Sequence, residues 1–124
     1  MSLFSWLLMG HFVGDWLLQN DWMARGKRKG LFTKAGMVHF TIYTTVIEAT
    51  LILAGATHQN LFWLLGIGGF IFITHWFVDA TNAVDRWMEL YQQTNITMVR
   101  VMVDQTFHLL VLMSLVLGLE INLL

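Results

Sequence analysis

The sequence predicts an all-α integral membrane protein, a four-helix bundle with short loops that occupies residues 1–124 as one domain. Three observations lead to this prediction: 56% of the 124 residues are hydrophobic, only 12% are charged, and Pro is absent. Soluble domains carry about 25% charged residues, and a soluble chain of this length has too little interior to bury so many apolar side chains. Without Pro, long apolar stretches can form uninterrupted helices.

Four apolar stretches approach the length that crosses a bilayer, which is about 20 helical residues. They run over residues 3–19, 36–54, 61–81 and 98–119. The first stretch contains His11 and Asp15 and lacks a cationic n-region, so we expect it to be retained rather than cleaved as a signal peptide. Between the third and fourth stretches, apolar residues recur at helical spacing at Val84, Trp87, Met88 and Tyr91. This spacing predicts a short amphipathic helix at the cytoplasmic interface.

The Lys and Arg residues predict the orientation, because cytoplasmic loops collect positive charge. Five of them lie between the first and second stretches: Arg25, Lys27, Arg28, Lys29 and Lys34. The remaining two, Arg86 and Arg100, flank the connection between the third and fourth stretches, which faces the same side in an alternating bundle. We therefore expect a multi-pass protein with both termini on the periplasmic side.

Charge and Cys content exclude several classes of protein. The chain has 8 acidic and 7 basic residues, a formal net charge of -1, so no diffuse basic field exists to hold a nucleic acid. The absence of Cys excludes a disulfide framework, a zinc ribbon and a thiolate nucleophile. Any metal ion must then be held by nitrogen and oxygen ligands.

Ionisable side chains inside the predicted spans form a repeated pattern. Spans one and three carry a His-x-x-x-Asp pair and span four the reverse: His11 with Asp15, His75 with Asp79, and Asp104 with His108. Residues four apart share a helix face, so each pair can point into the bundle. In span four the order of His and Asp is reversed, and the chain crosses the membrane in the opposite direction. Every Asp is therefore expected nearer the cytoplasm than the His of its pair. His39 of the second span is expected at the level of the carboxylates.

These seven residues predict a metal site, because buried ionisable groups cost several kcal/mol unless they are paired, hydrated or metal-bound. Zinc is the expected divalent ion, with manganese and iron as alternatives, either in a dinuclear centre or as one ion with spare acid–base groups. A metal-free hydrogen-bonded or proton-relay network and unrelated structural roles remain open. Glu48 lies half a turn off the common face and His58 in a short outer connection, so neither is expected at the site.

The motifs carry a resemblance to a known family. The stretch His11-Phe-Val-Gly-Asp15-Trp-Leu-Leu-Gln19, with the later His75-x-x-x-Asp79 and Asp104-Gln-x-x-His108 elements, resembles a family of small bacterial and phage membrane proteins of unknown function. The resemblance covers nearly the whole chain and implies a bacterial inner-membrane protein with four helices and inward His and Asp residues. A looser similarity connects it to small inner-membrane proteins described as metal-dependent hydrolases. The paired motifs also look like the zinc site of cation diffusion transporters, which are longer and have six spans.

The expected function is a membrane-embedded, metal-dependent hydrolase of lipid-linked or phosphoester substrates, open to the cytoplasmic leaflet, with no catalytic residue assigned. A metal would polarise the ester or phosphoryl oxygen and lower the pKa of water. The expected partners are membrane lipids and a lipid-linked substrate. The sequence is also compatible with a homodimer. The alternatives are a metal-ion or proton transport module and a di-iron membrane oxidoreductase.

Overall fold

In the computed structural model, the chain is helical, and residues 1–56 and 60–123, with side chains to residue 120, are described. No strand occurs in this part of the chain, which confirms the all-α prediction. The predicted outer connection at His58 lies outside the described residues. In chain order the elements are α1 (Leu3–Phe12), the π-helical η1 (Val13–Leu17), α2 (Asp21–Gly26), α3 (Lys34–Leu53), α4 (Leu61–Ala80), α5 (Ala83–Leu90) and α6 (Thr97–Leu123).

Three of these helices are long and apolar enough to cross a membrane: α3, α4 and the Thr97–Glu120 part of α6. The first predicted span is shorter than expected, because ten residues of α1 and five of η1 are followed by a break before α2. Asn20 explains the break, since its side chain accepts a hydrogen bond from the Met23 amide at 3.0 Å and so begins α2. In the described residues, three long helices and one shorter helical segment thus stand where the sequence predicts four spans.

Side-chain caps set where four of the helices begin. A side-chain oxygen just before each helix accepts a hydrogen bond from a backbone amide three residues on; these caps are Ser2, Asn20, Thr33 and Asn60. Such caps satisfy amides that have no partner within the helix. The sequence signal for the helix starts is therefore local.

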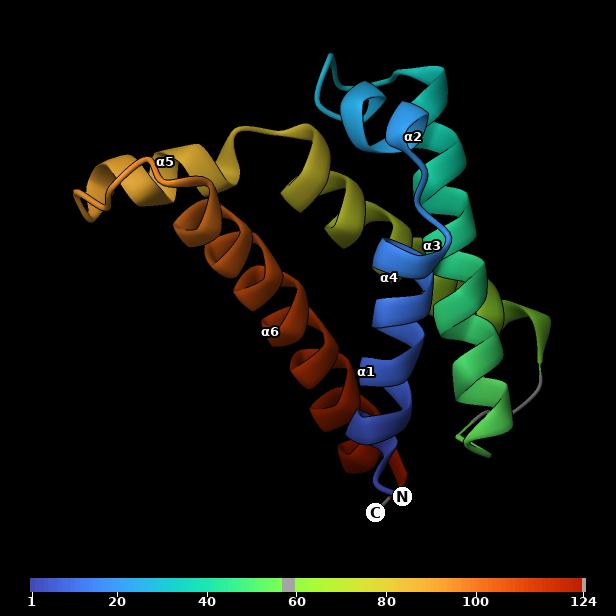
Figure 1. The fold of residues 1–124 in the computed structure, drawn as a ribbon. Helices are drawn as coiled ribbons and strands as arrows, with labels where there is room; N and C mark the ends of the chain where they lie inside the picture. The colour runs from blue at the N-terminus through green and yellow to red at the C-terminus, as the bar shows by residue number, and fades with distance from the viewer. Residues whose placement is uncertain (57–59, 124) are drawn as a thin grey trace.

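The helices alternate in direction, so both termini lie at one end of the molecule, with α2 and α5 at the other (Figure 1). At the end that holds the termini, apolar side chains of α1, α3, α4 and α6 form the main core; they include Leu7, Ile47, Ile71 and Leu112. In Figure 1, α6 lies near α1 at this end and slopes away from it toward α5. The polar residues described below lie beyond the core, toward α2 and α5.

Two glycines allow α1 and η1 to approach α3 closely. A Cβ on Gly10 would lie 2.5 Å from the Thr50 hydroxyl oxygen, and a Cβ on Gly14 would lie 3.3 Å from the Tyr43 Cα. In the chain, Gly10 directly precedes His11 and Gly14 directly precedes Asp15. The close contact with α3 therefore also brings the first His-x-x-x-Asp pair against the middle of the bundle.

The helix predicted from Val84, Trp87, Met88 and Tyr91 exists as α5. Its apolar face, however, packs on protein: Val84 and Met88 are buried against α6, where they meet Val103 and Phe107. Trp87 stays partly exposed. The helix α5 is therefore anchored to α6. The sequence pattern alone could not distinguish this arrangement from a helix that contacts only the membrane.

Candidate metal centre

Six of the seven predicted ligands meet at the end of the bundle that carries α2 and α5. They form two groups in which one ligand atom per residue lies within 4.8 Å of the others: Asp15, His39, His75 and Asp79 in the first, and Asp79, Asp104 and His108 in the second. All six side chains are buried. Asp79 belongs to both groups and is therefore the residue on which the site is centred.

The first group surrounds the side chain of Lys27, which the sequence analysis placed in a cytoplasmic loop. The Lys27 ammonium nitrogen lies 2.6 Å from Asp79 Oδ2 and 3.5 Å from Asp15 Oδ1, and the whole residue is only 5% exposed. His39 Nε2 lies 3.2 Å from each of these two oxygens. The first group is therefore a buried ion-pair network, and the exposed basic residues of the first connection are four rather than five.

His39 and His75 complete the first group through a contact between their rings. Their Nε2 atoms lie 2.9 Å apart, at hydrogen-bond distance, and His75 Nε2 is 3.3 Å from Asp79 Oδ2. The Nδ1 atoms of both rings are buried without a hydrogen-bond partner. Both imidazoles thus direct Nε2 at the same two carboxylates.

The second group has a different character, because it brings hydrogen-bond acceptors together. His108 Nδ1 donates to the backbone carbonyl of Asp104 at 2.9 Å, so Nε2 of the neutral ring presents its lone pair to the site. Asp79 Oδ1 lies 3.6 Å from this Nε2, and neither atom has a hydrogen-bond partner. Buried polar atoms are normally satisfied. A cation between the two acceptors would satisfy both.

His11, the seventh expected ligand, lies outside both groups. Its Nε2 donates to Gln105 Oε1 at 2.8 Å, and its Nδ1 lies 3.0 Å from the Tyr43 hydroxyl. With Nε2 protonated, Nδ1 of the neutral ring accepts from Tyr43. Both ring nitrogens are therefore used, and His11 supports the site from the side of the apolar core.

Gln105 and Tyr43 are site residues that the sequence reasoning did not assign. The Gln105 amide donates to Asp15 Oδ2 at 3.0 Å and to Asp104 Oδ2 at 3.3 Å, so it joins carboxylates of both groups. Tyr43 follows His39 by four residues and shares its helix face, which was the available signal. No comparable periodic signal marks Lys27, because it lies at the end of a short helix in a basic run.

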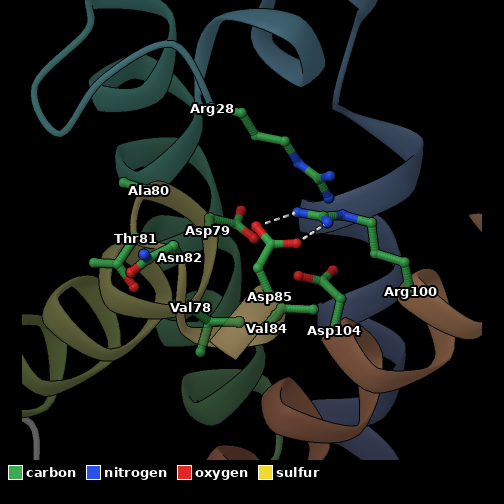
Figure 2. Close-up of a pocket in the computed structure, with 10 residues that line it drawn as sticks. All are labelled: Arg28, Val78, Asp79, Ala80, Thr81, Asn82, Val84, Asp85, Arg100 and Asp104. Carbon is green, nitrogen blue, oxygen red and sulfur yellow. Dashed lines mark hydrogen bonds and ion pairs between the residues drawn. The ribbon is translucent and has the colours of Figure 1, made fainter. Parts of the chain in front are cut away.

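A cavity of about 200 Å³ adjoins the second group (Figure 2). Asp79 and Asp104 lie on its wall together with two guanidinium groups, those of Arg28 and Arg100. Arg100 donates to both carboxylate oxygens of Asp85, with Nη2 at 3.0 Å from Oδ2. These hydrogen bonds lower the pKa of the Asp85 carboxyl below its ordinary value. In Figure 2, the Arg28 side chain extends over the cavity, where it can meet an anionic group.

A second opening of about 650 Å³ reaches the site between η1, α2 and α6. It is lined by Asp15, Trp16, Lys27, Asp104 and other residues of the three elements. Asp104 and Arg28 line both openings. Solvent and small solutes can therefore approach the second group from two directions at the α2 and α5 end.

The family model that describes a protein of unknown function (DUF3307) matches residues 3–123. The chain belongs to the DUF3307 family. The match spans almost the whole chain and confirms the expected membership of a family of unknown function. Neither the comparison with curated proteins nor the comparison with solved structures found a match. For this DUF3307 chain, the case for a function therefore has to come from the site.

Proposed function

We propose that the protein is an inner-membrane enzyme that uses a divalent cation to hydrolyse a phosphoester bond of a lipid-linked substrate at the cytoplasmic leaflet. Asp79, Asp104 and His108 hold the cation. Zinc is the expected ion, with manganese and iron as alternatives that the mixed oxygen and nitrogen ligands accept. The observation that carries the proposal is the buried His108 Nε2, which faces the unpartnered Asp79 Oδ1.

Membrane insertion is supported by the three long apolar helices and by the outward side chains. Large apolar residues on the outer faces of α3, α4 and α6 are exposed, among them Leu53, Phe62, Ile73 and Leu110. A bilayer would cover them. The shared end of the termini carries no Lys or Arg in the described residues, whereas the α2 and α5 end carries Arg25, Arg28 and Arg86. The rule that positive loops stay inside thus supports a cytoplasmic position for the site.

The charge balance of the site favours a divalent cation. Asp15, Asp79 and Asp104 are buried there, against one buried ammonium from Lys27. With all three carboxylates ionised and the imidazoles neutral, the buried groups carry two uncompensated negative charges. Uncompensated buried charge is strongly destabilising. One divalent ion at the second group removes this imbalance.

The chemistry follows from the groups that reach the cavity. A bound divalent ion supplies positive charge to a phosphoryl oxygen and to water. Water attacks phosphorus, the bond from phosphorus to the ester oxygen breaks, and the released oxygen takes up a proton from solvent. The proton that the attacking water loses passes to solvent through the two openings. Arg28 binds the phosphate as it enters.

A lipid-linked substrate is supported by what surrounds the openings. Trp16 lines the larger opening and is 56% exposed, and Leu17 next to it is 76% exposed. An apolar side chain and a guanidinium at one opening match a molecule with an apolar tail and an anionic head group. The substrate would approach within the leaflet and present its phosphate to Arg28.

Elemental analysis of the detergent-purified protein, followed by a phosphate-release assay, tests the proposal. We expect bound zinc, manganese or iron, and metal-dependent release of phosphate from a long-chain lipid phosphate presented in mixed micelles. Asp104→Ala and His108→Ala should lose the ion, whereas Glu48→Ala should keep it, because the Glu48 carboxylate lies against Gly68, about two helical turns from His75 along α4. A parent protein without metal would contradict the proposal. Metal flux into proteoliposomes without hydrolysis would instead establish transport.

A further inference from the structure

We infer that Lys27 occupies the position of a second cation, so that the centre takes one divalent ion and the ammonium of Lys27 serves in place of another. The inference rests on the proposed function and sharpens it. It assigns Asp15, His39, His75 and Asp79 to a latent cation site that is filled by the protein's own side chain.

The surroundings of Lys27 Nζ are those of a cation site. Asp79 Oδ2, His39 Nε2 and Asp15 Oδ1 lie at 2.6, 3.4 and 3.5 Å from it. These are distances for an ammonium that donates to or approaches its neighbours, and longer than the roughly 2.0–2.2 Å of bonds from zinc to nitrogen or oxygen. The four residues of this group could hold a metal ion by residue type and spacing, but the ammonium already lies among their ligand atoms and compensates one of the two carboxylate charges.

Asp79 connects the two cation positions through its separate oxygens. Its Oδ2 accepts from Lys27, and its Oδ1 faces His108 Nε2. Carboxylates that bridge two cations in this way are expected in a dinuclear centre, where one ion stabilises the attacking oxygen and the other the leaving oxygen. Here one of the two charges is an ammonium, which cannot be removed by a chelator.

The backbone around Lys27 is held close to the site by contacts between α2 and α3. A Cβ on Gly26 would lie 2.2 Å from the Ala35 Cβ, and one on Gly36 would lie 3.4 Å from the Lys27 Cα, so the end of α2 sits directly on the first turn of α3. Thr33 Oγ1 also donates to the Gly26 carbonyl at 2.8 Å. These three contacts hold the Lys27 backbone beside the site, so the ammonium stays within reach of the carboxylates.

The expected consequence is a metal stoichiometry that changes when Lys27 is replaced. Lys27→Met removes the charge and leaves an unbranched side chain one atom shorter, and Lys29→Met is the matched control because Lys29 is exposed. We expect about one metal ion per chain in the wild type and in Lys29→Met. After addition of excess zinc and removal of unbound metal, Lys27→Met should hold about two, and the double variant Lys27→Met with Asp15→Asn should return to one.

Elemental analysis against protein concentration separates this inference from the proposed function. One ion in the wild type and one in Lys27→Met would overturn the inference alone, as would two ions in the wild type. No ion in the wild type would overturn both. Should Lys27→Met not fold, Asp15→Asn decides the matter: we expect it to keep the single ion, because Asp15 belongs only to the Lys27 group, and loss of the ion would overturn the inference.

Discussion

The Tyr43 ring lies flat on the His75 ring, with 3.7 Å between the ring centroids and 4° between the ring planes. The same Tyr43 places its hydroxyl 3.0 Å from His11 Nδ1. One side chain of α3 therefore positions a His of α4 by its face and a His of α1 by its hydroxyl. This links His11 to His75 of the first group of candidate ligands.

Removing the two contacts of Tyr43 separately should give graded effects. Tyr43→Phe retains the stacked ring and leaves His11 Nδ1 without its donor, which we expect to lower the free energy of unfolding by about 1–3 kcal/mol. Tyr43→Leu also removes the ring and should lower it further. Unfolding in mixed micelles, followed by circular dichroism, measures both. Equal losses for the two variants would show that the stacked ring contributes nothing.

Gly10 should be intolerant of a side chain, because α1 and α3 touch there. Gly10→Ala directs a Cβ to 2.5 Å from the Thr50 hydroxyl oxygen, and we expect a loss of about 1–3 kcal/mol from overpacking. Gly66→Ala is the matched control, since its Cβ would meet no other atom within 4 Å. Thermal unfolding of both variants is the measurement. A Gly10→Ala variant as stable as Gly66→Ala would mean that the two helices are packed less closely.

The attachment of α5 should weaken in acid because of the pair between Asp85 and Arg100. The folded-state pKa of Asp85 is lowered, so the pair's contribution is fully present above the unfolded pKa of about 3.9 and is lost as the pH falls through the lower folded value. A spin label at Glu89→Cys should become more mobile below about pH 4. In Asp85→Asn the label should be mobile already at neutral pH, and an immobile label there would refute this role.

Orientation can be tested cleanly, because the chain contains no Cys. We expect Ser2→Cys to react with a membrane-impermeant maleimide from the periplasmic side. Lys29→Cys, at the opposite end of the molecule, should react only after the inner membrane is permeabilised. The reverse pattern would place the site at the periplasmic leaflet and would contradict the proposed access from the cytoplasm.

The periodic part of the site could be predicted from the sequence, because residues four apart in a helix point to the same side of it. His75 and Asp79, four residues apart, do point to one place, and Asp104 and His108 meet them from α6. The two His residues of the otherwise similar pairs in α1 and α6 nevertheless differ. His108 has its Nδ1 bound to the backbone carbonyl of Asp104, whereas His11 is held by side chains 32 and 94 residues away in the chain. Spacing within one helix contains no information about those distant partners.

By itself, the sequence determined that the protein is helical, that its long helices are apolar enough for a membrane, and that His and Asp residues gather on inward faces. These properties follow from composition and from the 3.6-residue helical period, which act locally. Only the tertiary structure decided that Lys27 enters the site, that Gln105 joins its two halves and that His11 stays outside. The physical reason is that buried charges and polar atoms take whichever partners the packing brings within reach. For Lys27 that packing is the contact of Gly26 with Ala35, which no pattern along the chain reveals.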